Sequence, residues 1–266
     1  MNPEIINLGF ISIRWYSALI LIGFIVGYYL VLNECNYKGI QKNVINDICF
    51  NLVIISIIGA RLYYCLFNLD YYGSNLLDIL KIWEGGLAIH GGIIAVLIYL
   101  IYESKKRKIH FLTLLDLFAP SLALGQVIGR WGNFFNGEAY GPVTTITNLK
   151  NLHIPKFIID GMYINGEYHH PTFLYESIGC LIIFIILMII RKLNEKKRGI
   201  IISTYFILYG IIRFFIESLR TDSLIIINFK VAQIVSILMT IVGIYILINV
   251  VRGKYDKQEM GYSIKR

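Results

Sequence analysis

The chain has 266 residues, 56% of them hydrophobic, with a mean hydropathy of +0.64 and a formal net charge of +8. A soluble domain of this length has too little interior to bury so much apolar surface, so the composition excludes an ordinary water-soluble protein and favours a bilayer. The four cysteines have no C-x-x-C spacing or histidine-rich neighbourhood, which argues against a metal site or a disulfide framework. We expect them to pack in the interior.

Seven apolar runs follow one another along the sequence, each close to the roughly 20 residues that a helix needs to cross a bilayer. A helix satisfies its own backbone hydrogen bonds, which makes it the favoured spanning element in lipid. The predicted spans are residues 12–32, 45–67, 86–102, 111–130, 172–190, 200–219 and 224–250. The sequence therefore predicts an all-α polytopic membrane protein with seven transmembrane helices, in which residues 1–266 form a single transmembrane domain.

Basic residues gather in the segments that alternate along the chain: the first loop, the ends of the third and fifth spans, and the C-terminal tail. They are Lys38, Lys42, Lys105, Lys106, Arg107, Lys108, Arg191, Lys192, Lys196, Lys197, Arg198, Arg252, Lys254, Lys257, Lys265 and Arg266. Short cytoplasmic loops carry an excess of Lys and Arg, so we expect the N-terminus outside and the C-terminus in the cytoplasm. Topology thus explains these charges, and no nucleic-acid partner is expected.

A second group of polar residues lies near the predicted outer ends of five spans, where topology does not explain it. The group comprises Arg14 and Tyr16 on the first span, Arg61 on the second, His90 on the third, Arg130 on the fourth, and Tyr209, Arg213, Glu217 and Arg220 on the sixth. The last four are spaced by four, four and three residues, so they share one face of a helix. Ionisable groups at membrane depth cost about 2.5–3.5 kcal/mol each on insertion scales. Their common depth therefore predicts a polar cavity that opens outward.

Each of these residues also has a structural interpretation. Arg14 could extend its side chain to the membrane interface, and Arg61 could be an ion-pair partner. His90, which is flanked by glycines, could be a hydrogen-bonded packing residue. The stripe from Arg213 to Arg220 could be a charge-balanced clamp between helices.

The stretch GRWGNFFNGEAYG, residues 129–141, adds further polar groups at the end of the fourth span. Arginines that face one cavity suit an anion, because a guanidinium fork binds phosphate oxygens in pairs. A phospholipid headgroup is the anion expected at this depth. Asn133 and Asn136 can bond glycerol-like hydroxyls, and Gly141 lets the backbone approach a ligand closely. Glu138 could hold an arginine in place or accept a hydroxyl proton.

His90 is the candidate for a general base at this depth, since the unperturbed pKa of histidine is about 6.5. Burial beside arginines is expected to favour its neutral, proton-accepting form. Neither a serine nor a cysteine has the setting of an activated nucleophile, so a covalent enzyme intermediate is disfavoured.

Six motifs, in order, resemble those of prolipoprotein diacylglyceryl transferases, the bacterial membrane enzymes that begin lipoprotein maturation. They are RWYS (14–17), GARLYY (59–64), WEGGLAIHGG (83–92), GRWGNFFNGEAYG (129–141), HPTFLYES (170–177) and YGIIRFFIESLR (209–220). The resemblance implies transfer of a diacylglyceryl group from phosphatidylglycerol to a lipobox cysteine thiol of prolipoproteins, with release of glycerol phosphate and no cofactor. It implies a multi-pass protein of the bacterial cytoplasmic membrane with its active site on the outer side.

The resemblance also implies a small external head, for which residues 132–171, between the fourth and fifth spans, are the candidate segment. Within this segment, the pair Asn165–Gly166 predicts a tight hairpin turn.

The same resemblance implies roles for individual residues. The family's essential histidine falls on His90, and its two essential arginines fall on Arg130 and Arg213. The expected substrate-binding residues are Tyr16, Arg130, Asn133, Asn136, Glu138, Gly141, Glu217 and Arg220. We expect Arg130 and Arg213 to hold the phosphate as the C–O bond breaks, while His90 accepts the proton of the thiol.

A transporter or flippase that binds an anionic solute from outside is the main alternative. Transporters commonly have inverted repeats and broken helices at the midplane, whereas this sequence has no clear internal repeat and gathers its polar residues on one side. A structural scaffold would leave the arginine cluster without a function.

Overall fold

The computed structural model describes residues 3–7, 12–35, 38–194, 197–226 and 229–255. Lys196, Lys257, Lys265 and Arg266, which belong to the basic segments used to predict topology, lie outside the described residues. Helices make up most of the described chain, and short strands pair into three small antiparallel sheets. The expectation of a mostly helical, polytopic membrane fold is confirmed at this level.

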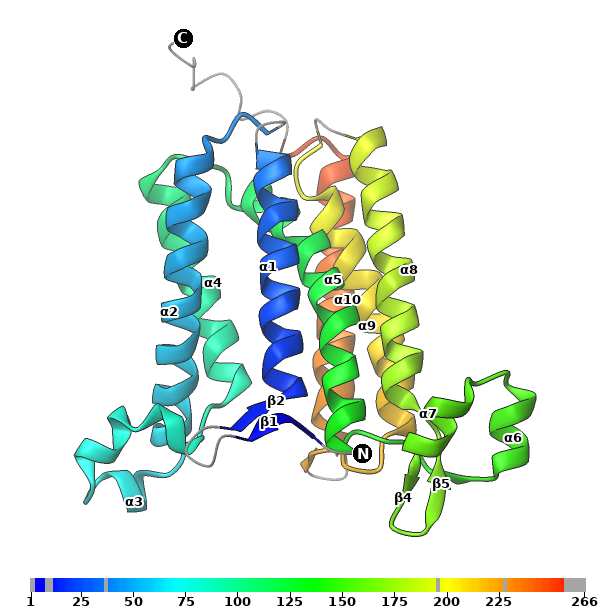
Figure 1. Cartoon of the computed structure of the whole chain (residues 1–266). Coiled ribbons are helices and arrows are strands. Elements are labelled where there is room, and N and C mark those ends of the chain that lie inside the picture. The colour runs from blue at the N-terminus through cyan, green and yellow to red at the C-terminus, as the bar shows by residue number, and fades with distance from the viewer. Residues whose placement is uncertain (1–2, 8–11, 36–37, 195–196, 227–228, 256–266) are drawn as a thin grey trace. The chain divides into compact units, whose positions relative to one another are not determined.

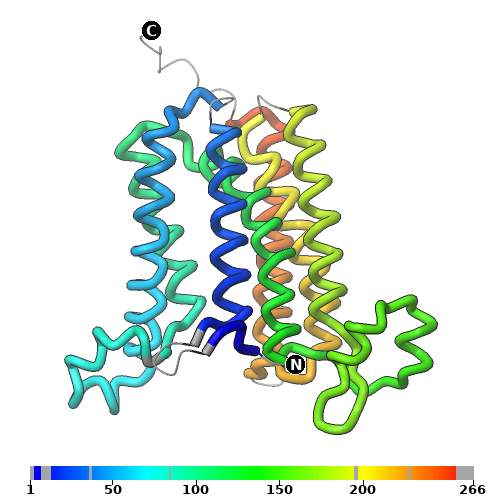
Figure 2. The backbone as a smooth tube through the Cα atoms, viewed as in Figure 1, coloured from blue at the N-terminus to red at the C-terminus, as the bar shows by residue number. Residues whose placement is uncertain are grey.

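Each of the seven predicted spans coincides with a long helix (Figures 1 and 2). The helices are α1 (Trp15–Cys35), α2 (Lys42–Leu66), α4 (Ile89–Lys106), α5 (Phe111–Asn136), α8 (Thr172–Leu193), α9 (Ile200–Leu219) and α10 (Val231–Val251). Among the described residues, six of these are long and apolar enough to cross a membrane. The seventh, α4, carries Glu103, Lys105 and Lys106 at its C-terminal end, so its crossing stays a prediction.

Two helix boundaries differ from the predicted ones by more than four residues. α5 continues to Asn136 instead of ending at residue 130, although glycine disfavours helix by about 1 kcal/mol relative to alanine. Its Gly132 packs against the ring of Tyr16, where an added Cβ would lie 2.7 Å from the ring carbon Cδ2. α10 begins at Val231 because the preceding residues form a short hairpin of β6 (Ile225–Ile226) and β7 (Phe229–Lys230).

The chain divides into two compact units, residues 1–30 with 115–266, and residues 31–114. In the second unit, α2 and α4 pack through small residues: a Cβ added to Gly59 would lie 2.7 Å from the carbonyl oxygen of Gly91. Such close backbone approach is how helices associate in lipid. Along the chain, α2 and α4 are separated by α3 (Leu69–Tyr72) and the 3-10 turns η1 (Leu76–Leu80) and η2 (Ile82–Glu84).

The first unit contains most of α1 and α5, together with α8, α9 and α10. α9 and α10 lie closest to each other, because Gly210 faces the backbone carbonyl of Ser236 and Gly243 faces that of Ser203. The N-terminal strands β1 (Glu4–Asn7) and β2 (Ser12–Arg14) form a hairpin that leads directly into α1.

The insert between α5 and α8 has its own apolar core. Its elements are β3 (Val143–Thr144), α6 (Ile146–Asn151), α7 (Lys156–Gly161), β4 (Tyr163–Ile164) and β5 (Glu167–His169), with strand order β3-β5-β4. Asn165 and Gly166 both have positive φ and connect β4 to β5, which confirms the predicted turn. The core combines Leu149, Ile154, Ile158, Ile159 and Met162 with Phe134 of α5 and Phe173 of α8. These two phenylalanines attach the insert to the end of α5 and the start of α8.

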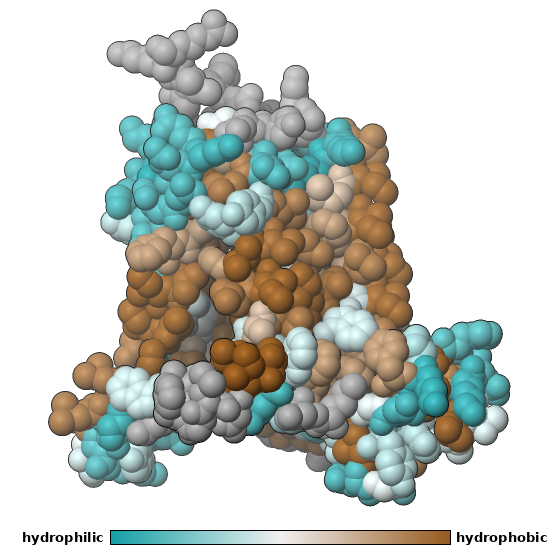
Figure 3. Space-filling model, in the orientation of Figure 1, coloured by the Kyte–Doolittle hydropathy of each residue, from teal (hydrophilic) through white to brown (hydrophobic). Residues whose placement is uncertain are grey.

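The long helices expose large apolar side chains along their length, for example Leu21 on α1 at 58% and Ile182 on α8 at 52%. On the face shown in Figure 3, hydrophobic residues cover the middle of the helices and hydrophilic residues gather toward their ends. This distribution fits lipid around the helices. All four cysteines are buried, as expected for packing residues.

Candidate active site

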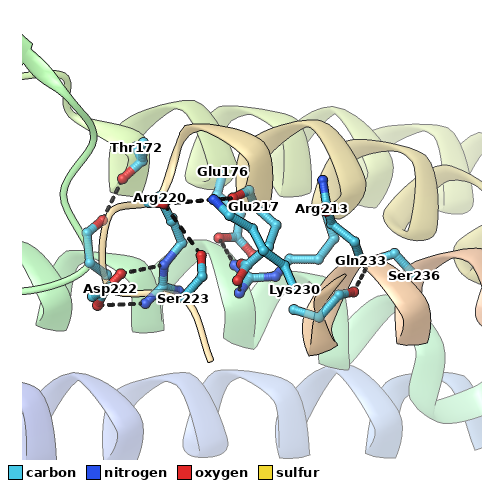
Figure 4. Close-up of polar contacts among 12 residues, drawn as sticks. Thr172, Glu176, Arg213, Glu217, Arg220, Asp222, Ser223, Lys230, Gln233 and Ser236 are labelled. Atoms are coloured by element: carbon cyan, nitrogen blue, oxygen red, sulfur yellow. Dashed lines mark hydrogen bonds and ion pairs between the residues drawn. The ribbon is translucent and has the colours of Figure 1, made fainter. Parts of the chain in front are cut away.

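A cluster of four charged side chains joins α5, α8 and α9. Arg130 of α5 contacts Glu176 of α8, with Nη2 2.8 Å from Oε1. Arg213 of α9 contacts the other oxygen of Glu176 at 2.8 Å and contacts Glu217, one turn along its own helix, at 2.6 Å. The hydroxyl of Tyr209 donates to Glu176 Oε1 at 3.1 Å. Part of this charge cluster is drawn in Figure 4.

The four charged groups differ in exposure. The side chains of Glu176 and Glu217 are 2% and 3% exposed, whereas those of Arg130 and Arg213 are 21% and 14% exposed. The carboxylates are therefore sealed inside the first unit, and the side chains of the two arginines remain partly exposed. A surface of this kind can accept an anion.

The predicted stripe on α9 holds for three of its four members. Tyr209, Arg213 and Glu217 face one network through Glu176. Arg220 instead pairs with Asp222, with Nε 3.0 Å from Oδ1 and Nη2 2.9 Å from Oδ2, as Figure 4 shows. The hydrogen bond from Arg220 holds the pKa of Asp222 below its ordinary value.

Lys230 closes the C-terminal end of α9. Its ammonium group donates to the backbone carbonyl oxygens of Glu217 and Arg220, each at 2.8 Å, and of Ser218 at 3.3 Å. Cations at this end of a helix satisfy carbonyl groups that have no partner within the helix. Thr221 reaches the insert by donating its hydroxyl to the carbonyl of Tyr140 at 3.2 Å.

The asparagines of the GRWGNFFNGEAYG stretch gather around Glu138. The amide groups of Asn133 and Asn136 donate to its Oε1 at 2.9 and 3.2 Å, and Nη1 of Arg130 lies 3.4 Å from the amide oxygen of Asn133. The carboxylate that holds Arg130 is therefore Glu176, whereas Glu138 orients the two asparagines. Gly137, with φ 64°, turns the chain between them.

Gly141 and Tyr16 have packing roles in the structure. The N–H of Gly141 donates to the carbonyl of His170 at 2.9 Å, and its own carbonyl oxygen lies 2.9 Å from Nδ1 of His169. A Cβ at Gly141 would lie 2.8 Å from the Cβ of His170. Tyr16 lies on Gly132, beside the stacked rings of Trp15 and Phe135.

His90 lies in the first turn of α4, in the second unit, and is exposed. The expected burial of His90 beside arginines is therefore not observed among the described residues of the second unit. The ring of Tyr63 is its aromatic neighbour, with centroids 6.3 Å apart. That His90 faces the same outward-opening cavity as Arg130 and Arg213 stays a prediction.

Arg61 is a structural hub of the second unit. It is 5% exposed, and its guanidinium donates to five backbone carbonyl oxygens, at 2.6–3.2 Å. These carbonyls belong to Asp78, Ile79, Lys81, Gly85 and Gly86. The contacts of the guanidinium are therefore with backbone carbonyl groups rather than with the carboxylate of an ion pair. They fix the segment that leads into α4.

Comparison with known proteins assigns the chain to a family. A family model described as "Prolipoprotein diacylglyceryl transferase" matches residues 3–249. The chain belongs to this family.

Curated relatives are similar over almost their whole length. A protein of Listeria monocytogenes serotype 4b is 45% identical over 93% of this chain and 89% of its own. One of Bacillus velezensis is 43% identical over 97% and 96%, and one of Clostridium novyi is 46% identical over 94% and 96%. All three are named phosphatidylglycerol–prolipoprotein diacylglyceryl transferase.

Sequence reasoning missed the residue that joins the cluster, Glu176. A signal was present: it is an acid near the start of the fifth predicted span, at the expected depth of Arg130 and Arg213. Asp222 and Lys230 were also missed. Asp222 follows Arg220 by two residues, close enough to suggest a local ion pair, but Lys230 reaches α9 only through the β6–β7 hairpin.

Proposed function

We propose that this chain transfers the diacylglyceryl group of phosphatidylglycerol to the lipobox cysteine thiol of prolipoproteins, the first step of lipoprotein maturation. The thiol sulfur forms a bond to the carbon of the diacylglyceryl group that carries the phosphate. The bond from that carbon to the phosphate oxygen breaks. The bonding electrons leave with the phosphate group, and glycerol phosphate is released. The thiol proton passes to a base, for which His90 is the candidate, since the thiolate is the attacking form.

One observation carries the proposal: in the charge cluster the two acidic side chains are buried and the two arginine side chains are partly exposed. The negative charge of the phosphate grows as the C–O bond breaks. Arg130 and Arg213, prearranged beside this group, would stabilise that charge more strongly than they stabilise the substrate. The acyl chains could then remain in lipid during the reaction.

The remaining candidate residues would arrange the headgroup. Asn133 and Asn136, oriented by Glu138, would face the hydroxyls of the terminal glycerol. Glu217 would hold Arg213, and Arg220 would bind the anion when it leaves Asp222. Tyr16 and Gly141 would support the site by packing, on α5 and on the start of the insert.

The topology of the proposed enzyme is seven spans with the N-terminus outside and the C-terminus in the cytoplasm. The support is the alternation of basic segments along the seven long helices. In this orientation the C-terminal ends of α5 and α9 and the insert 132–171 lie outside. The site would face the outer side of the bacterial cytoplasmic membrane, where prolipoproteins emerge.

The test replaces Arg130 in the purified full-length protein and measures thioether formation from phosphatidylglycerol and a lipobox peptide. We expect Arg130→Ala to lower kcat by about 10²–10³-fold, the usual cost of losing one donor to a developing anion. Arg130→Lys should also be impaired, because lysine keeps the charge but not the planar fork. Arg107→Lys, at the basic end of α4, is the matched control. Near-normal turnover in both Arg130 variants would refute the proposed phosphate site. Solute flux across liposome membranes that contain the purified protein, without a peptide substrate, would favour a transporter.

A further inference from the structure

A single buried carboxylate joins the two arginines of the charge cluster. Glu176 lies in the first turns of α8, and its side chain is 2% exposed. One carboxylate oxygen accepts from Arg130 and from the hydroxyl of Tyr209, and the other accepts from Arg213. Each oxygen therefore fixes a guanidinium group from a different helix. Glu217 contacts Arg213 from within α9, so the ion pairs that connect Arg130 of α5 to Arg213 of α9 run through Glu176.

The cluster contains two positive and two negative groups, Arg130 and Arg213 against Glu176 and Glu217. Charges buried this deeply are retained only when they are paired. The acids therefore cancel the formal charge of the arginines before a ligand arrives. An incoming phosphate meets guanidinium groups whose positive charge is already balanced.

The charge of the proposed ligand changes during the reaction. Phosphatidylglycerol is a phosphodiester with one negative charge, whereas glycerol phosphate is a monoester with a charge of about −1.5 to −2 at pH 7. Coulomb attraction grows with the charge of the ligand. Two uncompensated arginines would therefore hold the product more tightly than the substrate, and product release would slow turnover.

We propose that Glu176 is a positioning residue for the transfer reaction. It sets the separation of the two phosphate-binding guanidinium groups, and its negative charge limits the affinity of the site for the released glycerol phosphate. This inference rests on the proposed function, because it requires the phosphate to bind at Arg130 and Arg213.

The first test removes the charge of Glu176 and keeps its size. Glycerol phosphate is titrated calorimetrically into the purified full-length protein, and kcat and KM are measured with phosphatidylglycerol and a lipobox peptide. In Glu176→Gln we expect glycerol phosphate to bind at least about tenfold more tightly, with both kcat and the KM for the lipid lowered. Unchanged or weaker binding of glycerol phosphate would overturn the proposal.

A second variant separates the charge from the position. Glu176→Asp keeps the charge but withdraws the carboxylate by one methylene group, so it cannot hold both arginines at the same separation. We expect glycerol phosphate affinity within about twofold of the parent and kcat lowered at least about tenfold. Normal kcat in this variant would overturn the positioning role, and the variant carries the test if Glu176→Gln does not fold.

The controls separate failure of the proposed phosphate site from failure of the inference on Glu176. Glu103 is also 2% exposed and pairs with an arginine, Arg107, so Glu103→Gln removes a buried paired acid elsewhere and should leave glycerol phosphate affinity unchanged. Arg130→Ala and Arg213→Ala should weaken glycerol phosphate binding. If they do not, the proposed phosphate site fails. If they do and Glu176→Gln has no effect, only the inference on Glu176 fails.

Discussion

We expect the hydrogen bonds of Arg61 to keep the segment that leads into α4 and His90 from opening locally. Its guanidinium donates to five carbonyl oxygens between Asp78 and Gly86, and its carbon Cζ lies 5.2 Å from the ring centroid of Tyr72. Lysine can donate at most three hydrogen bonds, from a single point. Arg61→Lys should therefore leave at least two of these carbonyls without their partner.

The magnitude follows from the hydrogen bonds lost. A hydrogen bond to a charged group contributes about 1.5–3 kcal/mol, so two lost bonds should destabilise the segment by about 3 kcal/mol at the lower end of that range. Local opening would then be about 100-fold more frequent, since each 1.4 kcal/mol is a factor of ten. The amides of Gly85 and Ala88 report it directly, because they donate to the carbonyls of Ile82 and Ala60.

Hydrogen exchange measured by mass spectrometry on peptides covering residues 76–92 is the assay. We expect exchange in Arg61→Lys to accelerate about 100-fold in these peptides, and Arg61→Ala to accelerate it further. Arg107→Lys is the matched control, because its partners are the carboxylates of Glu103 and Asp47 at the other end of α4. Unchanged exchange in Arg61→Ala would refute the role of Arg61 as the support of this segment.

Two further predictions concern the ends of the insert and of α9. The lowered pKa of Asp222 means that its pairing with Arg220 stabilises the fold above the pKa of an unfolded Asp, about 3.9, and that this contribution is lost as the pH falls through the lower folded value. Thermal denaturation between pH 6 and pH 2 should show it, and Asp222→Asn should abolish this part of the pH dependence. Gly141→Ala places a Cβ 2.8 Å from that of His170 and should lower the free energy of unfolding by about 1–3 kcal/mol. Gly129→Ala, where an added Cβ meets open space, should be neutral or stabilising, and equal effects of the two substitutions would contradict the packing argument.

Hydropathy predicted the long helices well, because the length of an apolar run is set by the thickness of the bilayer. It located their ends less well, as α5 illustrates. The apolar run ends near residue 130, but the helix continues to Asn136, with Gly132 packed against Tyr16. The consequence is functional: Asn133 lies one turn from Arg130 on the same helix face and contacts it.

The candidate site was predictable in its cations and less so in its anions. Arg130 and Arg213 stood out because a charge in an apolar run is costly and therefore conspicuous. A buried Glu176 is equally costly, but its role depends on which helices pack against α8. Hydrophobic periodicity does not reveal which helices are neighbours. Glu138, for which two roles were left open, accepts from the two asparagines close to it in sequence, whereas the acid that contacts Arg130 is Glu176, which is distant in sequence.

The clamp and the binding site are compatible interpretations of the charge cluster. Arg130, Glu176 and Arg213 do join three helices, as a clamp would. Replacing a buried ion pair by apolar groups is often neutral or stabilising, and lipid penalises charge further, so stability alone would favour apolar contacts between these helices. A purely structural clamp gives no reason for the arginine side chains to be more exposed than the acidic ones. If the cluster served only to hold the helices together, we would expect arginines and acids to be equally buried. Here the acids are sealed and the arginines remain accessible, as an anion-binding function requires.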